Sequence, residues 1–230
     1  MSAGSESAQA MQPAATPARA MFFALVSIGL LCGLLIAAAY EATKPVIEKN
    51  RAEALERAIF QVVPGASQSA SFVRGADDSF APGKTPKHAV VHAAYGQDGS
   101  LLGLAIEASG MGYQDMISML YGYSLERQAI VGMAVLSSRE TPGLGDRVES
   151  DPGFLRNFSE LDVSVRPDGE ALAHPLTAVK PGQKTQPYEI DTITGATVSS
   201  SAVARILAES SQLWVPLLRR RAADFARRQP

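Results

Sequence analysis

The sequence predicts an α+β protein, with a single N-terminal transmembrane helix followed by one α+β domain. An uncharged apolar run lies near the N-terminus, strand-like segments cluster in the middle of the chain, and helical patterns lie on both sides of that cluster. This grouping is typical of α+β folds and differs from the regular alternation of βαβ units. The 230 residues are enough to bury a substantial core.

The apolar run is predicted to be a membrane anchor. Residues 1–20 are mostly small and polar and are predicted to be disordered. Residues 21–40 carry no charge, and a helix of this length matches the roughly 30 Å hydrocarbon layer of a bilayer. A cleaved signal peptide is the alternative, because Ala37–Ala39 resembles a cleavage site, but the run is longer than the apolar core of most signal peptides.

The residues alone leave the side of the membrane open. Arg19 precedes the span, whereas Lys44, Lys49, Arg51 and Arg57 follow it within about twenty residues. Taken literally, the positive-inside rule keeps the C-terminal part in the cytoplasm. That rule describes short loops, however, and a large domain can be translocated regardless of its charge.

Hydrophobic patterning predicts the elements that follow the span. Residues 41–65 are expected to form an amphipathic juxtamembrane helix, and residues 67–87, rich in Ser, Gly, Pro and Asp, a loop. Two strands are expected on either side of a turn at Asp98-Gly99. Further strands are expected at 116–121, 129–137, 161–165 and 188–193.

The last predicted helix begins at Ser199, and Pro216 is expected to kink or restart it. Residues 215–230 are expected to form a basic tail, which contains Arg219, Arg220, Arg221, Arg227 and Arg228. A solvated helix end with cations near the negative end of the helix dipole explains these arginines. Binding to acidic lipid or to a partner subunit is the alternative.

Composition and failed motifs exclude several functions. The net charge of −2 gives no indication of nucleic-acid binding, and the single cysteine, Cys32, excludes an internal disulfide and a cysteine-ligated cluster. Asp78 stands where a P-loop ending in Gly83–Thr85 needs its first glycine, and Asp115 stands where a dinucleotide motif needs its third. His88 and His92 are expected on a strand without an acidic partner between them, so no metal site is predicted.

Two short motifs carry the functional prediction. The first is the loop ETPGLGD at residues 140–146, in which Pro142 and two glycines form a tight turn whose backbone N–H groups can face a ligand. The second is DTITGAT at residues 191–197, in which Gly195 lets the backbone approach a phosphate at an electropositive helix start. Thr197 is either the N-cap of that helix or the carrier of a phosphate-bearing group. Taken alone, each motif is also compatible with an ordinary turn.

Together, and behind an N-terminal anchor, these motifs resemble the family of membrane-anchored flavoproteins with covalently attached FMN, particularly the G subunit of the Rnf ion-translocating electron-transport complex. The resemblance extends from about residue 20 to residue 214 and includes TKPVIEKN at 43–50, QVVPGA at 61–66, and the two motifs above. One departure is visible: many members have His-Lys before the ETPGLG loop, whereas this chain has Ser138-Arg139.

The resemblance implies a role for each motif residue. It implies that Thr197 is esterified to the FMN phosphate, and that Asp191, Thr194, Gly195 and Ala196 belong to the segment read by a flavin transferase. It also implies that the loop borders the flavin, with Glu140, Thr141, Gly143, Leu144 and Gly145 as the neighbouring residues. No residue is expected to be catalytic or to bind a metal.

The implied protein is a translocase component in the bacterial inner membrane, whose FMN-binding domain (residues 88–214) lies on the periplasmic side. It relays electrons within an Rnf-type complex that couples ferredoxin/NAD electron transfer to ion translocation, so its expected partners are the other subunits, membrane lipid and the flavin transferase. Two alternatives stay open: the C subunit of the Na⁺-translocating NADH:quinone oxidoreductase, and a non-redox membrane-anchored binding module in which TGAT only begins a helix.

Overall fold

The structure, a computed structural model, describes residues 18–83 and 90–226. The chain divides between Arg51 and Ala52 into two units. The first consists of most of a long helix. The second contains the end of that helix together with the sheets and the remaining helices.

Helix α1 (Ala18–Val62) is 45 residues long and joins the predicted span and the predicted juxtamembrane helix into one element. It is long and apolar enough to cross a membrane, and the large apolar side chains from Met21 to Tyr40 are exposed, as a lipid-facing segment requires. The prediction of disorder for residues 1–20 is wrong at its end, because residues 18–20 are already helical; residues 1–17 lie outside the described part. Pro45 lies inside the helix.

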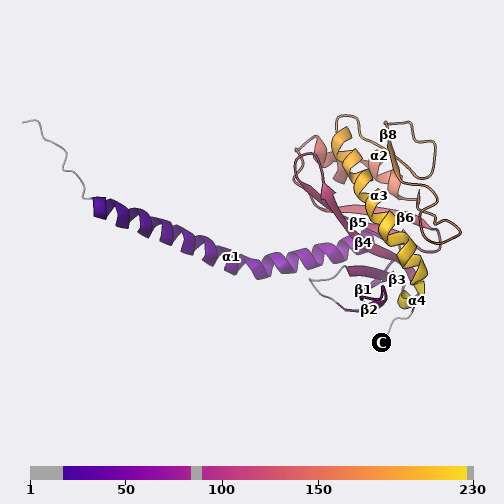
Figure 1. The fold of residues 1–230 in the computed structure, drawn as a ribbon, viewed down its shortest axis with the longest axis horizontal. Helices are drawn as coiled ribbons and strands as arrows, with labels where there is room; N and C mark the ends of the chain where they lie inside the picture. The colour runs from indigo at the N-terminus through magenta and orange to yellow at the C-terminus, as the bar shows by residue number, and fades with distance from the viewer. Residues whose placement is uncertain (1–17, 84–89, 227–230) are drawn as a thin grey trace, which may run out of the picture. The chain divides into compact units, whose positions relative to one another are not determined.

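The second unit contains a seven-stranded antiparallel sheet with the order β2-β1-β3-β4-β5-β6-β7 (Figure 1). The strands are β1 (Gln68–Arg74), β2 (Phe80–Pro82), β3 (Val90–Tyr95), β4 (Leu101–Met111), β5 (Met116–Ser124), β6 (Ala129–Ser137) and β7 (Leu161–Asp162). The predicted hairpin is confirmed, with Gly99 at its turn in a left-handed conformation (φ +79°). The strand predicted at 161–165 is shorter, and Val165 forms only an isolated bridge with Leu172.

The loop predicted at residues 67–87 is wrong, because β1 and β2 lie there and extend the sheet. Phe72 and Phe80 are buried, and both rings pack on Phe225, with centroid distances of 5.1 and 4.9 Å. The partner that buries these strands comes from the other end of the chain. The sheet therefore begins well before residue 88.

A long connection follows β6 and leads to the last helix. It contains η1 (Gly145–Glu149), α2 (Pro152–Leu155), η2 (Arg156–Phe158), and a second sheet of two parallel strands, β8 (Thr177–Val179) and β9 (Glu189–Asp191). The strand predicted at 188–193 corresponds to β9, whereas β8 was not predicted. This connection brings the residues around 140–147 close to the start of the final helix.

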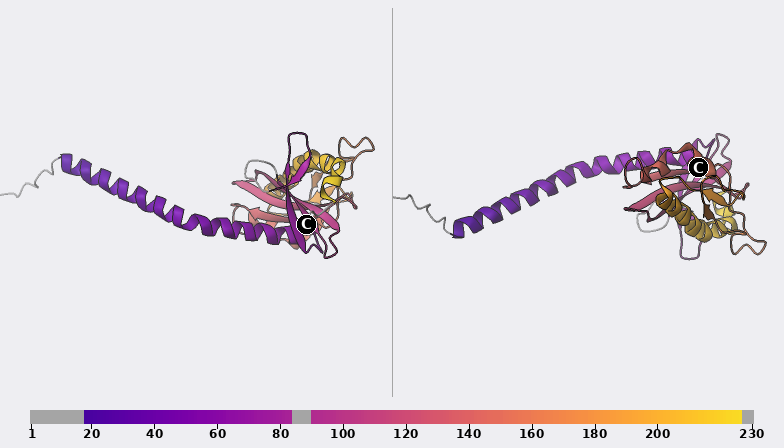
Figure 2. Two further views of the ribbon diagram at one scale, coloured as in Figure 1. Left: turned by 90° about the horizontal axis from the view of Figure 1, so that it is seen from below. Right: turned by 90° about the horizontal axis from the view of Figure 1, so that it is seen from above.

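Helix α3 (Thr197–Arg220) lies across one face of the large sheet (Figures 1 and 2). It begins two residues before the predicted start. It also continues past Pro216, so the predicted restart is wrong; Pro216 is itself buried in the helix interior. Its inner face contributes Val203, Leu207 and further side chains to the main core.

The basic tail predicted at residues 215–230 is largely part of the domain, which corrects that prediction. Val215, Leu217 and Leu218 are buried, and Phe225 at the end of α4 (Ala222–Phe225) is fully buried. The Tyr95 hydroxyl donates a 3.0 Å hydrogen bond to the Phe225 carbonyl. Arg227 and Arg228 lie outside the described residues.

The opposite face of the sheet is covered by the last two turns of α1. Ala58, Ile59 and Val62 pack there on small side chains of the central strands. The Val62 carbonyl would lie 2.0 Å from a Cβ placed on Gly122 and 2.5 Å from one on Gly132. The helix end therefore fits only because these two positions have no side chain.

Candidate functional site

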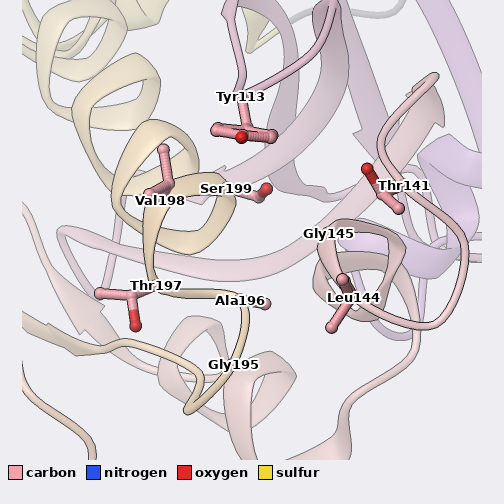
Figure 3. Close-up of a pocket in the computed structure, with 9 residues that line it drawn as sticks. All are labelled: Tyr113, Thr141, Leu144, Gly145, Gly195, Ala196, Thr197, Val198 and Ser199. Carbon is pink, nitrogen blue, oxygen red and sulfur yellow. The ribbon is translucent and has the colours of Figure 1, made fainter.

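A cavity of about 410 Å³ lies at one end of the domain, where three segments meet (Figure 3). The turn between β4 and β5 contributes Tyr113, the loop after β6 contributes Thr141, Leu144 and Gly145, and the start of α3 contributes residues 195–199. Both sequence motifs therefore reach the same cavity although they lie about fifty residues apart in the chain. A cavity of this size falls within the roughly 300–1,000 Å³ usual for cofactor sites.

Thr197 is the first residue of α3 and lies at the edge of the cavity. The N-cap position is occupied by Ala196, which gives no side-chain cap, so the alternative in which Thr197 is the N-cap is wrong. Among the described residues, the exposed Thr197 side chain makes a single hydrogen bond, 3.3 Å from Oγ1 to the Ile193 carbonyl. Its hydroxyl is thus available at a helix start whose first amides have no partners within the helix.

The turn before α3 is held by one arginine. Gly195 has φ +84°, a conformation that favours glycine. Arg147 Nη1 donates a 2.9 Å hydrogen bond to the Thr194 carbonyl, and its Nη2 pairs with Asp151 Oδ2 at 2.8 Å. A cation therefore lies beside the turn that presents Thr197, where it favours an anionic group.

Glu140 lies behind the cavity rather than in it. Its side chain is 5% exposed, and Oε1 accepts hydrogen bonds from the amides of Tyr113, Gln114 and Asp115 at 3.0, 2.9 and 3.4 Å. Oε2 accepts a 2.5 Å hydrogen bond from the Ser199 hydroxyl. One carboxylate thus joins the β4–β5 turn and the start of α3 to the loop after β6.

The Glu140 network is closely packed and charged. A Cβ on Gly145 would lie 2.7 Å from both Glu140 Oε2 and Ser199 Oγ, and one on Gly112 would lie 2.5 Å from Glu140 Oε1. Burial opposes ionisation of Glu140, but the hydrogen bonds from Ser199 and the three amides outweigh it and hold the pKa of this carboxyl below its ordinary value of 4.5. Glu140 is therefore ionised at neutral pH.

Of the other predicted residues, some line the cavity and some do not. Thr141 and Leu144 line the cavity; Thr141 Oγ1 donates to Gln114 Oε1 at 3.1 Å, and Leu144 is 53% exposed. Gly143 has φ +77° and open space where a Cβ would be, and it does not line the cavity. Thr194 and Asp191 do not line it either. Asp191 Oδ1 instead accepts from the amides of residues 183 and 184 and so fixes the preceding loop.

Three lining residues were not predicted from the sequence: Tyr113, Val198 and Ser199. Tyr113 is 67% exposed and Val198 57% exposed, so both present apolar surface at the cavity mouth. Val198 and Ser199 directly follow the TGAT motif, and their position in the first turn of α3 was the signal that could have found them. The signal for Tyr113 was an aromatic residue in a turn between two strands, a weak signal without knowledge of where that turn lies.

The donor set fits a phosphate-bearing aromatic cofactor. The first turn of α3 and the Thr197 hydroxyl lie at the cavity, Arg147 binds the turn that precedes them, and the exposed apolar side chains of Tyr113, Leu144 and Val198 also line the cavity. Within residues 18–83 and 90–226, no group of three or more metal-ligating side chains is present. His92 hydrogen-bonds to Ser71 Oγ through Nδ1 at 3.1 Å, whereas His88, Lys84 and Thr85 lie outside the described residues.

Comparison with known proteins agrees with this site. The model of the FMN-binding domain family matches residues 112–212. The G subunit of the ion-translocating oxidoreductase complex of Methanosarcina acetivorans is 30% identical over 190 residues, covering 80% of this chain and 87% of that protein. The same subunit of Pseudomonas aeruginosa (strain UCBPP-PA14) is 30% identical over 192 residues, covering 80% and 79%. The crystal structure of NqrC from Shewanella oneidensis shares the fold, with a TM-score of 0.59 at 18% identity over 76% of this chain and 99% of that one.

Proposed function

The chain belongs to the G-subunit family of ion-translocating oxidoreductase complexes, and from this premise we propose that it is a membrane-anchored electron carrier whose FMN is esterified through its phosphate to Thr197. Bound FMN supplies reversible electron transfer. The chain itself supplies attachment, position and electrostatic environment. Within an Rnf-type complex it relays electrons between other subunits while the whole complex couples ferredoxin/NAD electron transfer to ion translocation.

One observation supports this proposal: Thr197, exposed at the start of α3, lines the same cavity as Thr141, Leu144 and Gly145 of the ETPGLG loop. The amides of the first helical turn would hold the phosphate of a phosphoester at Thr197, and Arg147 near the preceding turn would favour its negative charge. Tyr113, Leu144 and Val198, whose exposed apolar surfaces suit an aromatic ring, would contact the flavin. No base or nucleophile is required of the chain after attachment, because the cofactor carries the electrons.

Two alternatives differ from this proposal in what they require. A non-redox binding module requires TGAT to serve only as a helix start, but the N-cap of α3 is Ala196 and Thr197 is one of the residues that line the cavity. The C subunit of the Na⁺-translocating NADH:quinone oxidoreductase shares the fold, as the NqrC likeness indicates, but the relatives at 30% identity are G subunits of ion-translocating oxidoreductase complexes.

The proposed surroundings follow from α1 and from family membership. The chain is anchored by α1 in the inner membrane among lipid and the other subunits of the complex. We place the domain on the periplasmic side, where covalent attachment retains a cofactor that is scarce outside the cytoplasm. An alkaline phosphatase fusion after residue 226 is then active in the periplasm; activity of a cytoplasmic reporter at the same position would instead place the domain inside.

The experiment that tests the function is intact-mass analysis of the full-length protein after purification in detergent. Co-expression with a flavin transferase should give a mass increased by FMN less one water, and a flavin-fluorescent band on a denaturing gel. Expression without the transferase should give neither. A full-length protein with unmodified mass in both cases would contradict the proposal.

A further inference from the structure

Glu140 places a buried negative charge directly behind the wall of the cavity. Gly145 and Ser199 form part of that wall, and a Cβ on Gly145 would touch both Glu140 Oε2 and Ser199 Oγ at 2.7 Å. Figure 3 shows the Ser199 hydroxyl pointing toward the segment that carries Gly145. The carboxylate is thus separated from a ligand in the cavity by little more than one backbone segment.

The groups that bind Glu140 are dipoles and carry no full charge. They are the amides of residues 113–115 and the Ser199 hydroxyl. The neighbouring cation, Arg139, is directed elsewhere and pairs with Asp115 Oδ2 at 3.5 Å. Hydrogen bonds from dipoles keep a carboxylate ionised but leave its net charge in place, and a charge acts over longer distances in a buried environment than in water.

The network favours an ionised side chain at this position. The three amides on Oε1 can only donate, and hydrogen bonds to an ionised acceptor are stronger than those to a neutral one. A glutamine could keep its Oε1 on these amides and donate its NH₂ to the Ser199 hydroxyl, which can also accept. Glutamine therefore removes the charge while matching the size of the side chain.

We propose that Glu140 is a positioning residue that holds the walls of the flavin cavity together and whose fixed negative charge lowers the reduction potential of the bound flavin. Electrons that arrive at the flavin add negative charge to it, and a nearby carboxylate opposes that addition. This inference rests on the proposed function, because it requires a flavin in the cavity.

The test compares three variants of the full-length, flavin-loaded protein by redox titration of the flavin absorbance. Glu140→Gln removes the charge, Glu140→Asp keeps the charge but shortens the side chain, and Glu149→Gln removes an equal charge from an exposed position in η1. We expect a more positive midpoint potential for Glu140→Gln alone. Equal potentials for Glu140→Gln and wild type, with normal flavin content in both, would overturn the electrostatic role.

The positioning role is measured without flavin. In protein made without the transferase, amide hydrogen exchange at residues 113–115 should accelerate in Glu140→Asp and Glu140→Gln and stay unchanged in Glu149→Gln. Unchanged exchange in both Glu140 variants would overturn this role.

If Glu140→Gln does not fold or load flavin, Ser199→Ala decides the electrostatic question. It removes one dipole that offsets the carboxylate, so the potential should become more negative; an unchanged or more positive value overturns the inference. These failures differ from failure of the proposed function, in which the wild-type protein itself carries no covalent flavin.

Discussion

Arg147 Nη1 donates a 2.9 Å hydrogen bond to the carbonyl of Thr194, which joins η1 to the turn that precedes Thr197. The same guanidinium is held by Asp151 through Nη2 at 2.8 Å, so its orientation is fixed from the other side. The residue after the ETPGLGD loop therefore braces the second motif. The two motifs depend on each other through this contact as well as through Glu140.

Replacing Arg147 with Ala should slow flavin attachment more than it destabilises the domain. The guanidinium is partly exposed, so loss of its two contacts should cost about 1 kcal/mol, whereas the turn that presents Thr197 loses its brace. Flavin occupancy after a timed reaction with transferase measures the first effect, and thermal melts of flavin-free protein measure the second. Arg156→Ala, in η2, serves as the control. Occupancy equal to wild type at every time point would show that the brace has no role.

Replacing Thr197 with Ala should abolish covalent flavin and leave the fold intact. The hydroxyl makes one 3.3 Å hydrogen bond, so its loss should cost no more than about 1 kcal/mol, or roughly 2–4 °C in melting temperature. Thr141→Ala is the matched control, since Thr141 also lines the cavity but lies outside the TGAT motif. In-gel fluorescence should vanish in the first variant and persist in the second. Fluorescence that persists in Thr197→Ala would exclude this attachment site.

The sequence predicted secondary structure best where the pattern of apolar residues within a segment is sufficient to identify it. The prediction for β6 has the observed bounds, Ala129–Ser137, because this nine-residue strand is a continuous apolar run. The strands β1 and β2 were missed because their composition is that of a loop. They are stabilised by Phe225, about 150 residues away, and local sequence carries no information on such a partner.

The same distinction holds for the site. Gly195, Thr197, Thr141, Leu144 and Gly145 belong to recognisable motifs, and all of them line the cavity. Tyr113 belongs to no motif; it lines the cavity from a turn whose amides donate hydrogen bonds to Glu140, far away in the sequence. A motif also does not show which of its residues line the cavity and which only hold the surrounding loops in place. Glu140 and Asp191 belong to the motifs but do not line the cavity; each accepts hydrogen bonds from backbone amides of another segment.

Adding a methyl group at Gly145 should disturb the flavin, whereas the same change at Gly143 should affect only stability. A Cβ on Gly145 would lie 2.7 Å from Glu140 Oε2 and from Ser199 Oγ, and relief of this overlap should cost about 1–3 kcal/mol and shift both walls of the cavity. Gly143→Ala meets open space and is opposed only by its φ of +77°, at a cost of about 1–2 kcal/mol. Both should therefore lower the melting temperature of flavin-free protein. Only Gly145→Ala should also shift the flavin absorbance, and the reverse pattern would mean that Gly143 is the residue next to the flavin.

Stability of the flavin-free protein should depend on pH through Glu140. The pKa of Glu140 is lowered by folding, so its ionised form contributes stability that is fully present above the ordinary value of 4.5 and is lost as the pH falls through the lower value of the folded state. At pH 7, Glu140→Gln should thus be less stable than wild type by about 1–3 kcal/mol, because the hydrogen bonds from the three amides and Ser199 lose their ionised acceptor. Below pH 4.5 this difference should narrow, since the wild-type carboxyl becomes protonated and also presents a donor.

Thermal melts of the two proteins between pH 7 and pH 3 measure this dependence. Other carboxyls with a lowered pKa contribute equally to the pH dependence of both proteins, so the comparison removes their contribution. One of them is Asp151, which accepts hydrogen bonds from the Phe154 amide and from Arg147. Asp151→Asn provides the matched control. The stability difference between wild type and Asp151→Asn should also narrow at low pH. The stability difference caused by Glu140→Gln should be the same in the Asp151→Asn background, because the two carboxyls bind different partners. A difference between wild type and Glu140→Gln that is constant over this range would mean that folding leaves the pKa of Glu140 at its ordinary value. A wild-type stability that instead rises relative to Glu140→Gln as the pH falls from 7 toward 4.5 would mean that Glu140 is protonated in the folded protein at neutral pH. The negative charge placed behind the cavity would then be absent, and the effect of Glu140 on the flavin potential would have to come from shape alone.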